Sequence, residues 1–247
     1  MELYINSISS SASELDFKAL IPDANMRRRM SPIVKMGVST AMECIRQSET
    51  QPIDAIITAT GLGCLADSEK FLKSILDNNE LLLNPTPFIQ STFNTIGGQI
   101  ALITGNHSYN MTYSHREASF ESALLDAVLL LNEEKENILV GAADEMTPTQ
   151  TKIMERLGAY RDGTKAGEGS HFFIISKKPS KNSLAILETI LIDKQEPTGT
   201  IDLKIIAPKS YHTASAEALY NGVLAIKNGA KRVVVYNNDF KTILRCL

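Results

Sequence analysis

Short apolar runs alternate with longer helix-period segments along the whole chain, and this alternation constrains the fold more than any other feature. The runs DAIITATG (54–61) and ENILVGAADE (136–145) are rich in β-branched or small apolar residues and contain glycine, as buried strands often do. From Ser31 to about Arg46 and over 119–134, apolar residues recur instead at helical spacing. The alternation predicts α/β layers around a mostly parallel sheet.

The remaining segments extend this pattern to both ends of the chain. Ser31 followed by proline is typical of a helix start, and Asn228-Gly229 is typical of a helix end. Because two strands follow the last helix, the sheet is predicted to be mixed. The proline-rich stretch 84–88 is predicted to be a loop, and no helix or strand is predicted in the polar, glycine-bearing stretch 151–170. The other predicted strands are 2–8, 109–115, 171–178, 184–192, 202–210, 231–238 and 241–247, and the other predicted helices are 67–79, 97–105 and 215–229.

The composition is that of an ordinary folded protein and excludes several classes. Hydrophobic residues make up 43% and charged residues 21% of the 247, which excludes a disordered chain. The net charge of -3 gives no basic excess for nucleic acid, and no apolar run approaches a membrane span. The N-terminus lacks the basic start and apolar core of a signal peptide, and the three cysteines have no paired spacing. We therefore expect a cytoplasmic protein.

No cofactor and no metal are predicted from the motifs. The glycines of GLGCL (61–65) and Gly97-Gly98 are too few for a dinucleotide fingerprint, and tight turns or close helix packing explain them. His115 and Glu117 stand two residues apart, but no third side chain follows at metal-ligand spacing.

Five segments occur in an order that resembles the N-terminal half of the β-ketoacyl synthases, a thiolase-fold family. They span roughly residues 54–176 and read TATGLGCLADSEKFL, NPTPFIQSTFNTIGGQIALITG, YNMTYSHREASFESALLDAV, ILVGAADEMTP and AGEGSHFFII. The resemblance implies a layered α/β/α fold with mixed sheets and an abbreviated second half. It further implies one domain over 1–247, with a fuller half at 1–150 and a shortened half at 151–247. Within the family, the chain is similar to the short ketosynthase-like and chain-length-factor subunits of aryl-polyene and flexirubin-type pigment synthesis.

The resemblance bears directly on the nucleophile. In active members a cysteine starts the buried helix of the third segment, where the helix dipole lowers its pKa. Glu117 stands at this position here, and Cys44, Cys64 and Cys246 lie elsewhere in the sequence. A carboxylate is a weak nucleophile and its acyl product would be a mixed anhydride, so the usual condensation is not expected. Alternatively, Glu117 is only an anion that satisfies free N–H groups at a helix start.

Active members also use two histidines, and only one of them has a counterpart in this chain. The segment PKSYHTAS resembles the lysine–histidine motif and places Lys209 and His212 at those positions. His212 is therefore a candidate general base or hydrogen-bond donor, or alternatively a structural helix cap. No segment resembles the motif of the other histidine. The closing glycine loop corresponds at best to NNDF, which ends at Phe240, so its oxyanion geometry is not expected.

The resemblance implies further contacts for an acyl chain and for a carrier protein. The implied substrate-binding residues are Phe88, Asn94, Ser119 and Phe240. The only dense basic run is either a solvated turn or a docking site for an acidic acyl carrier protein, and it consists of Arg27, Arg28 and Arg29.

These observations predict a ketosynthase-like protein without condensing activity. It would partner an active ketosynthase and an acyl carrier protein in fatty-acid or polyketide synthesis, and the family implies a dimer, homo- or heteromeric, through the strand 109–115. Two alternatives remain: an acyl-thioester decarboxylase or hydrolase that uses Glu117 and His212, and a non-catalytic homodimeric scaffold. The chain is short for an active member, and the missing residues fall where the first histidine and the glycine loop would lie.

Overall fold

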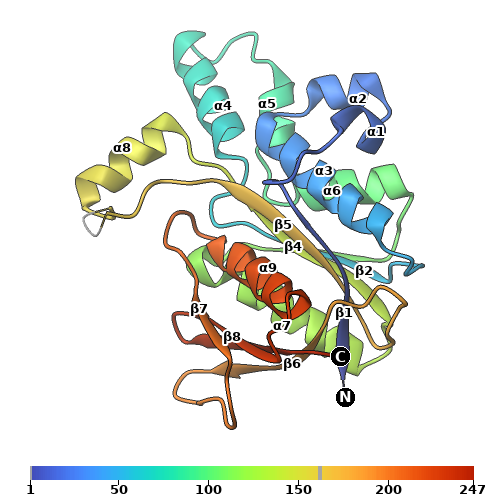
Figure 1. The fold of residues 1–247 in the computed structure, drawn as a ribbon. Coiled ribbons are helices and arrows are strands. Elements are labelled where there is room, and N and C mark those ends of the chain that lie inside the picture. The colour runs from blue at the N-terminus through green and yellow to red at the C-terminus, as the bar shows by residue number, and fades with distance from the viewer. Residues whose placement is uncertain (1, 161–162) are drawn as a thin grey trace.

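Nine strands form one continuous mixed sheet in the computed structural model, which describes residues 2–160 and 163–247 (Figure 1). Their order in the sheet is β3-β2-β4-β5-β1-β6-β9-β8-β7. The strands are β1 (Leu3–Ser10), β2 (Ala55–Ala59), β3 (Tyr109–Tyr113), β4 (Asn137–Asp144), β5 (Gly169–Ser176), β6 (Ala185–Ile192), β7 (Leu203–Ile206), β8 (Arg232–Asn237) and β9 (Phe240–Arg245). The helices are α1 (Phe17–Leu20), α2 (Ala24–Arg29), α3 (Pro32–Gln47), α4 (Leu65–Asp77), α5 (Pro85–Gln90), α6 (Thr95–Thr104), the 3-10 helix η1 (Arg116–Ala118), α7 (Ser119–Asn132), α8 (Pro148–Leu157) and α9 (Ala214–Lys227).

The sheet contains the same strand arrangement twice. In the first half β2 is parallel to β4, β4 is antiparallel to β5, and β5 is antiparallel to β1. In the second half β7, β8, β9 and β6 repeat these relations in the same order. The first half continues beyond β2 into β3, whereas no described strand lies beyond β7. The second half is thus a shortened copy of the first, which confirms the predicted α/β class with a mixed sheet. The expectation of a mostly parallel sheet is wrong, because five of the eight described strand pairings are antiparallel.

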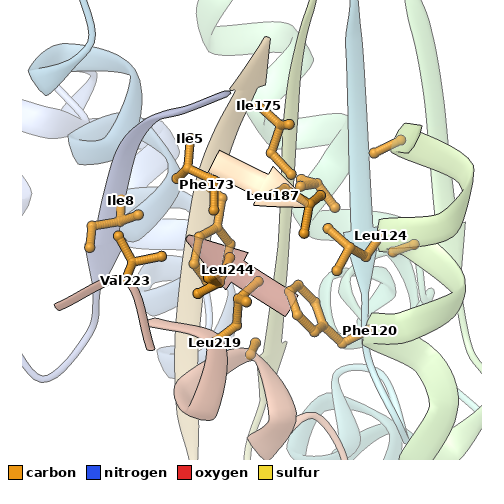
Figure 2. Close-up of a cluster of buried hydrophobic side chains, with 14 of the residues drawn as sticks. Ile5, Ile8, Phe120, Leu124, Phe173, Ile175, Leu187, Leu219, Val223 and Leu244 are labelled. Atoms are coloured by element: carbon orange, nitrogen blue, oxygen red, sulfur yellow. The ribbon is translucent and has the colours of Figure 1, made fainter. Parts of the chain in front are cut away.

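Two apolar cores lie on the two faces of the first-half sheet, because side chains alternate along each strand. On one face α3 and α6 cover Ile56 and Leu139, and on the other face α7 and α9 cover Ile57 and Val140. The second core continues onto β6, β8 and β9, so α7 and α9 lie between the two half-sheets (Figure 2). The layers are therefore α/β/α around the first half-sheet.

A loop crosses the outer face of the second half-sheet, whereas helices cover the corresponding face of the first half-sheet. It joins β6 to β7 over residues 193–202. Arg232 and Lys241 alternate with core residues of β8 and β9, so both side chains point away from α9. Lys241 Nζ pairs with Glu196 Oε1 at 2.9 Å, and the Arg232 guanidinium donates to Thr198 O. These two basic side chains hold the loop on the sheet.

The structure corrects the sequence prediction at four helices, because α1, α2, α5 and α8 lie where no helix was predicted. Both α5 and α8 begin with a proline that follows a capping side chain. The Asn84 side chain accepts from Thr86 N, and the Thr147 hydroxyl accepts from Gln150 N. The predicted loop at 84–88 is therefore wrong. None of the described helices has the length and apolar character needed to cross a membrane.

Candidate functional site

A cavity of about 540 Å³ opens where the ends of β7 and β8 meet the starts of α7 and α9. Helix α8 projects from the body of the molecule in Figure 1 and contributes Met154 to one wall. The other large apolar or aromatic lining residues include Met146, Tyr160, Ile206, Tyr211 and Tyr236. The polar lining residues include Glu117, Lys204, Lys209, His212, Ser215, Asn237 and Asn238. The lining therefore offers both apolar and polar contacts to a bound molecule.

Glu117 stands at a tight turn that precedes α7. Arg116 adopts a left-handed backbone conformation with φ of 49°. The buried Ser119 hydroxyl accepts from His115 N at 2.7 Å and donates to Arg116 O at 2.6 Å, which fixes the turn. Glu117 is exposed at this N-terminal end, where the helix dipole favours an anion. Ser119 thus holds the turn and is not among the residues that line the cavity.

The turn between β8 and β9 holds the Glu117 segment from the second half. Asn237 Nδ2 donates to Glu117 O at 2.9 Å and to Glu121 Oε1 at 2.7 Å. Asn238 Nδ2 lies 3.5 Å from Glu117 Oε2. Glu121 lies one turn further along α7, where burial raises the pKa of its carboxyl. Phe240 starts β9 and does not line the cavity, whereas Asn238 of the same turn does.

His212 lies on the cavity wall because its neighbours fix the backbone on both sides. Gly61 packs so closely that a β-carbon added there would lie 2.2 Å from His212 Cβ. Thr213 donates from N (3.0 Å) and Oγ1 (2.8 Å) to Asp144 Oδ2. Asp144 Oδ1 accepts from Gly61 N (2.8 Å) and Thr60 Oγ1 (2.7 Å). The buried Asp144 therefore joins the end of β2 to the start of α9, whose N-cap is Thr213 and not His212.

The structure brings Glu117, Lys209 and His212 together on one cavity, and it places the other candidate residues elsewhere. Phe88 is exposed on α5, where its ring centroid lies 5.2 Å from that of Phe71. Asn94 is the N-cap of α6 and lines a separate hollow of about 570 Å³ between α2, α5 and α6.

The basic run lies away from the cavity, in the last turn of α2. Arg27 donates to Ile21 O at 2.5 Å, so part of its hydrogen-bonding capacity is used within the chain. Arg28 and Arg29 are exposed. Docking of a carrier protein at this run stays a prediction.

Several lining residues were not singled out from the sequence. Tyr211 and Ser215 lie within the segment that was matched to the lysine–histidine motif, so their presence near His212 follows from that match. Met154 and Tyr160 lie on and just after α8, a helix that was not predicted. The cap, proline and terminal glycine of that helix were the available signals.

The three cysteines lie outside the cavity. Burial raises the pKa of the Cys44 and Cys64 thiols to about 12, so both are protonated near neutral pH. Cys246 is exposed beyond β9. Within residues 2–160 and 163–247, no group of three or more His, Cys, Asp or Glu side chains is placed to hold a metal ion.

The repeated strand order, the two central helices between half-sheets and a polar site at the starts of those helices define a thiolase-like α/β/α protein of the ketosynthase type. The sequence agrees with the fold. The chain belongs to the β-ketoacyl synthase family, because the family model described as "Beta-ketoacyl synthase, N-terminal domain" matches residues 7–157. A search of curated proteins found no match.

Solved ketosynthase structures share the fold over the whole chain at low sequence identity. The ishigamide ketosynthase/chain length factor has a TM-score of 0.78 and 12% identity, with 100% of each chain covered. A ketosynthase in complex with its chain length factor from Xenorhabdus doucetiae has a TM-score of 0.65 and 15% identity, with 99% of each chain covered. A β-ketoacyl synthase from Burkholderia phymatum has a TM-score of 0.74 and 10% identity, with 100% of this chain and 99% of that chain covered.

Proposed function

We propose that this protein is a ketosynthase-like subunit without condensing activity, which pairs with an active ketosynthase and takes part in acyl or polyketide chain synthesis. One observation carries the proposal: Glu117 occupies the helix start on a cavity that His212 and Lys209 also line. The sequence resemblance to the ketosynthases implies that the nucleophile of active members stands at this helix start. A carboxylate there supplies a fixed negative charge but no storable thioester.

The surroundings of Glu117 support this proposal. Neither buried thiol lies on the cavity, and the raised pKa of both disfavours a thiolate. The largely apolar wall suits an acyl chain, which favours a ligand-binding subunit over a scaffold that binds none.

A free sheet edge supports a partner chain. β3 pairs only with β2 among the described strands, so the other side of β3 has unpaired backbone groups. Met111 on β3 is 42% exposed, and Leu102 on α6, a helix that packs against β3, is 68% exposed. Two of the similar structures are described as a ketosynthase with a chain length factor, and another as a ketosynthase in complex with an acyl carrier protein.

Two measurements test this function. Co-expression with a cysteine-bearing ketosynthase encoded beside this chain, followed by light scattering on the purified complex, is expected to show a heterodimer. Incubation with acyl carrier protein thioesters is expected to leave the intact mass of this chain unchanged. A stable acyl adduct on any of its residues would contradict the proposal.

A second candidate function is decarboxylation or hydrolysis of an acyl thioester. The shared cavity of Glu117 and His212 favours it, because a carboxylate and an imidazole that line one cavity are both groups that can move a proton to or from a bound substrate. Turnover of malonyl or acyl thioesters that is lost in both Glu117→Gln and His212→Ala would support this assignment. Turnover that survives both substitutions would exclude it.

A further inference from the structure

The cavity that holds Glu117 also carries positive charge that the proposed function does not use. Its carboxylate, ammonium and imidazole side chains are Glu117, Glu196, Lys204, Lys209 and His212. Glu196 is neutralised from outside the cavity, because Lys241 Nζ lies 2.9 Å from its Oε1. Among the described residues, neither Lys204 nor Lys209 forms an ion pair with a carboxylate, Glu117 included. The unpaired charges of the cavity are therefore two ammonium groups and one carboxylate.

Lys204 is held at the cavity wall by an aromatic ring. Its Nζ lies 5.9 Å from the centroid of the Tyr236 ring on the neighbouring strand β8, within the range of a cation–π contact. Both side chains line the cavity. Asp202, the nearest carboxylate in the sequence, accepts from Lys231 N and Arg232 N at the start of β8. The Lys204 ammonium therefore keeps N–H donors for a bound molecule.

The surroundings of Lys204 favour an anion in the cavity. Apolar and aromatic side chains, among them Met154, Ile206 and Tyr211, form part of the same lining, and walls of low polarity strengthen the attraction between charges. Lys204 is also exposed to solvent on the edge strand β7, so salt weakens this attraction.

We propose that Lys204 and Tyr236 form an anion-binding subsite, which takes one anionic oxygen group, a carboxylate or a phosphate, of the acyl thioester in the cavity. Lys204 binds the anion as a compact charge with rotatable donors, and the Tyr236 ring positions it. A carboxylate can belong to the acyl chain itself, and a phosphate to the arm that carries the chain. This inference rests on the proposed function, in that it requires an acyl thioester in this cavity.

Isothermal titration of the full chain with two matched pairs of thioesters tests the subsite. The first pair is octanoyl-N-acetylcysteamine and suberoyl-N-acetylcysteamine, which has a carboxylate at the far end of the acyl chain. The second pair is octanoyl-pantetheine and octanoyl-phosphopantetheine. The anionic member of at least one pair is expected to bind about five-fold more tightly at low ionic strength, as one partly solvated ion pair allows, and the difference is expected to shrink as salt is added. The pair that shows the preference identifies the anion as carboxylate or phosphate.

The outcomes separate the subsite from the proposed function. Equal affinity within both pairs overturns the subsite and leaves the proposed function standing, since Lys204 then only keeps other strands from the edge of β7. A preference that does not change with salt also overturns the subsite. Failure of all four thioesters to bind overturns the subsite and counts against the proposed function.

Variants assign the preference to Lys204, with thermal unfolding used to confirm that each variant is folded. Lys204→Met is expected to abolish the preference for the anionic thioester while binding of octanoyl-N-acetylcysteamine persists. Lys181→Met is the matched control, because it removes the same charge from an exposed lysine outside the cavity, and it should keep the preference. A preference that survives in folded Lys204→Met, or that is lost only in Lys209→Met, overturns the assignment.

A second pair of variants tests the aromatic ring. Tyr236→Phe retains the ring and should retain the preference, whereas Tyr236→Leu should reduce it. An unchanged preference in folded Tyr236→Leu would remove Tyr236 from the subsite.

Discussion

Asp144 joins three segments through hydrogen bonds to one buried carboxylate. It receives four donors from the end of β2 and the start of α9. Replacing it by alanine leaves these donors buried without an acceptor, so we expect Asp144→Ala to lower the free energy of unfolding by about 2 to 4 kcal/mol. Urea denaturation followed by circular dichroism measures this loss. Asp239→Ala, at an exposed turn residue, is the control and should change stability by less than about 0.5 kcal/mol.

His171 makes stability depend on pH in a defined direction. It is 4% exposed on β5, and burial lowers its pKa from 6.5 to about 4. Between these two pH values the imidazole binds a proton in the unfolded chain but not in the folded one. The stabilisation that comes from keeping His171 neutral is therefore complete above pH 6.5 and is lost as the pH falls toward 4. The loss amounts to about 2 kcal/mol between pH 7 and pH 5.

Variants are needed to separate the effect of His171 from that of buried carboxyls. Burial raises the pKa of the Glu121 and Asp144 carboxyls, so these two groups favour the folded state as the pH falls, whereas His171 disfavours it. The stability of His171→Gln should fall less between pH 7 and pH 5 than that of the parent. His107→Gln, which alters an exposed histidine, should follow the parent curve. Identical pH dependence in the parent and His171→Gln would show that His171 is not responsible.

At the scale of elements, the close approach of β2's end to the start of α9 decides where His212 lies. A methyl group at Gly61 would meet the His212 side chain at 2.2 to 2.7 Å, so backbone or imidazole must move. We expect Gly61→Ala to destabilise the protein by about 1 to 3 kcal/mol. Gly98→Ala is the matched control inside α6, where an added methyl meets nothing within 4 Å. It should stabilise the isolated chain by up to about 1 kcal/mol, because alanine favours the helix. Equal effects of the two substitutions in thermal unfolding would contradict the packing argument.

A helix or strand could be predicted from the sequence when the residues within it carry a clear pattern. β2 and β4 were predictable because continuous apolar runs suit strands buried on both faces. α8 was missed because its described residues bury no apolar face, and only its caps mark it. For the site, the family resemblance placed Glu117 and His212, since each lies in a matched segment. The contacts of Asn237 and Glu121 were not predictable, because 116 residues separate them and only the repeated strand order brings them together.

At the scale of the whole molecule, the two half-sheets differ in what covers and extends them. The first half has helices on both faces and an extra edge strand, β3. The second half has a loop on its outer face and ends at β7. The cavity of Glu117 is lined by residues at the end of β7, so its wall lies beside the edge strand of the second half, beyond which no described strand follows. The two edge strands of the described sheet, β3 and β7, therefore differ in their surroundings.

These two edges give a direct test of which one receives the partner chain. Met111 on β3 and Leu203 on β7 are 42% and 41% exposed, so lysine at either site adds a comparable charge to an edge strand. We expect Met111→Lys to prevent the heterodimer with the ketosynthase, because a lysine on an edge strand opposes pairing with another chain. Leu203→Lys should leave the complex intact. Size-exclusion chromatography with light scattering reads both variants against the parent, and loss of the complex in Leu203→Lys alone would place the partner on β7 instead.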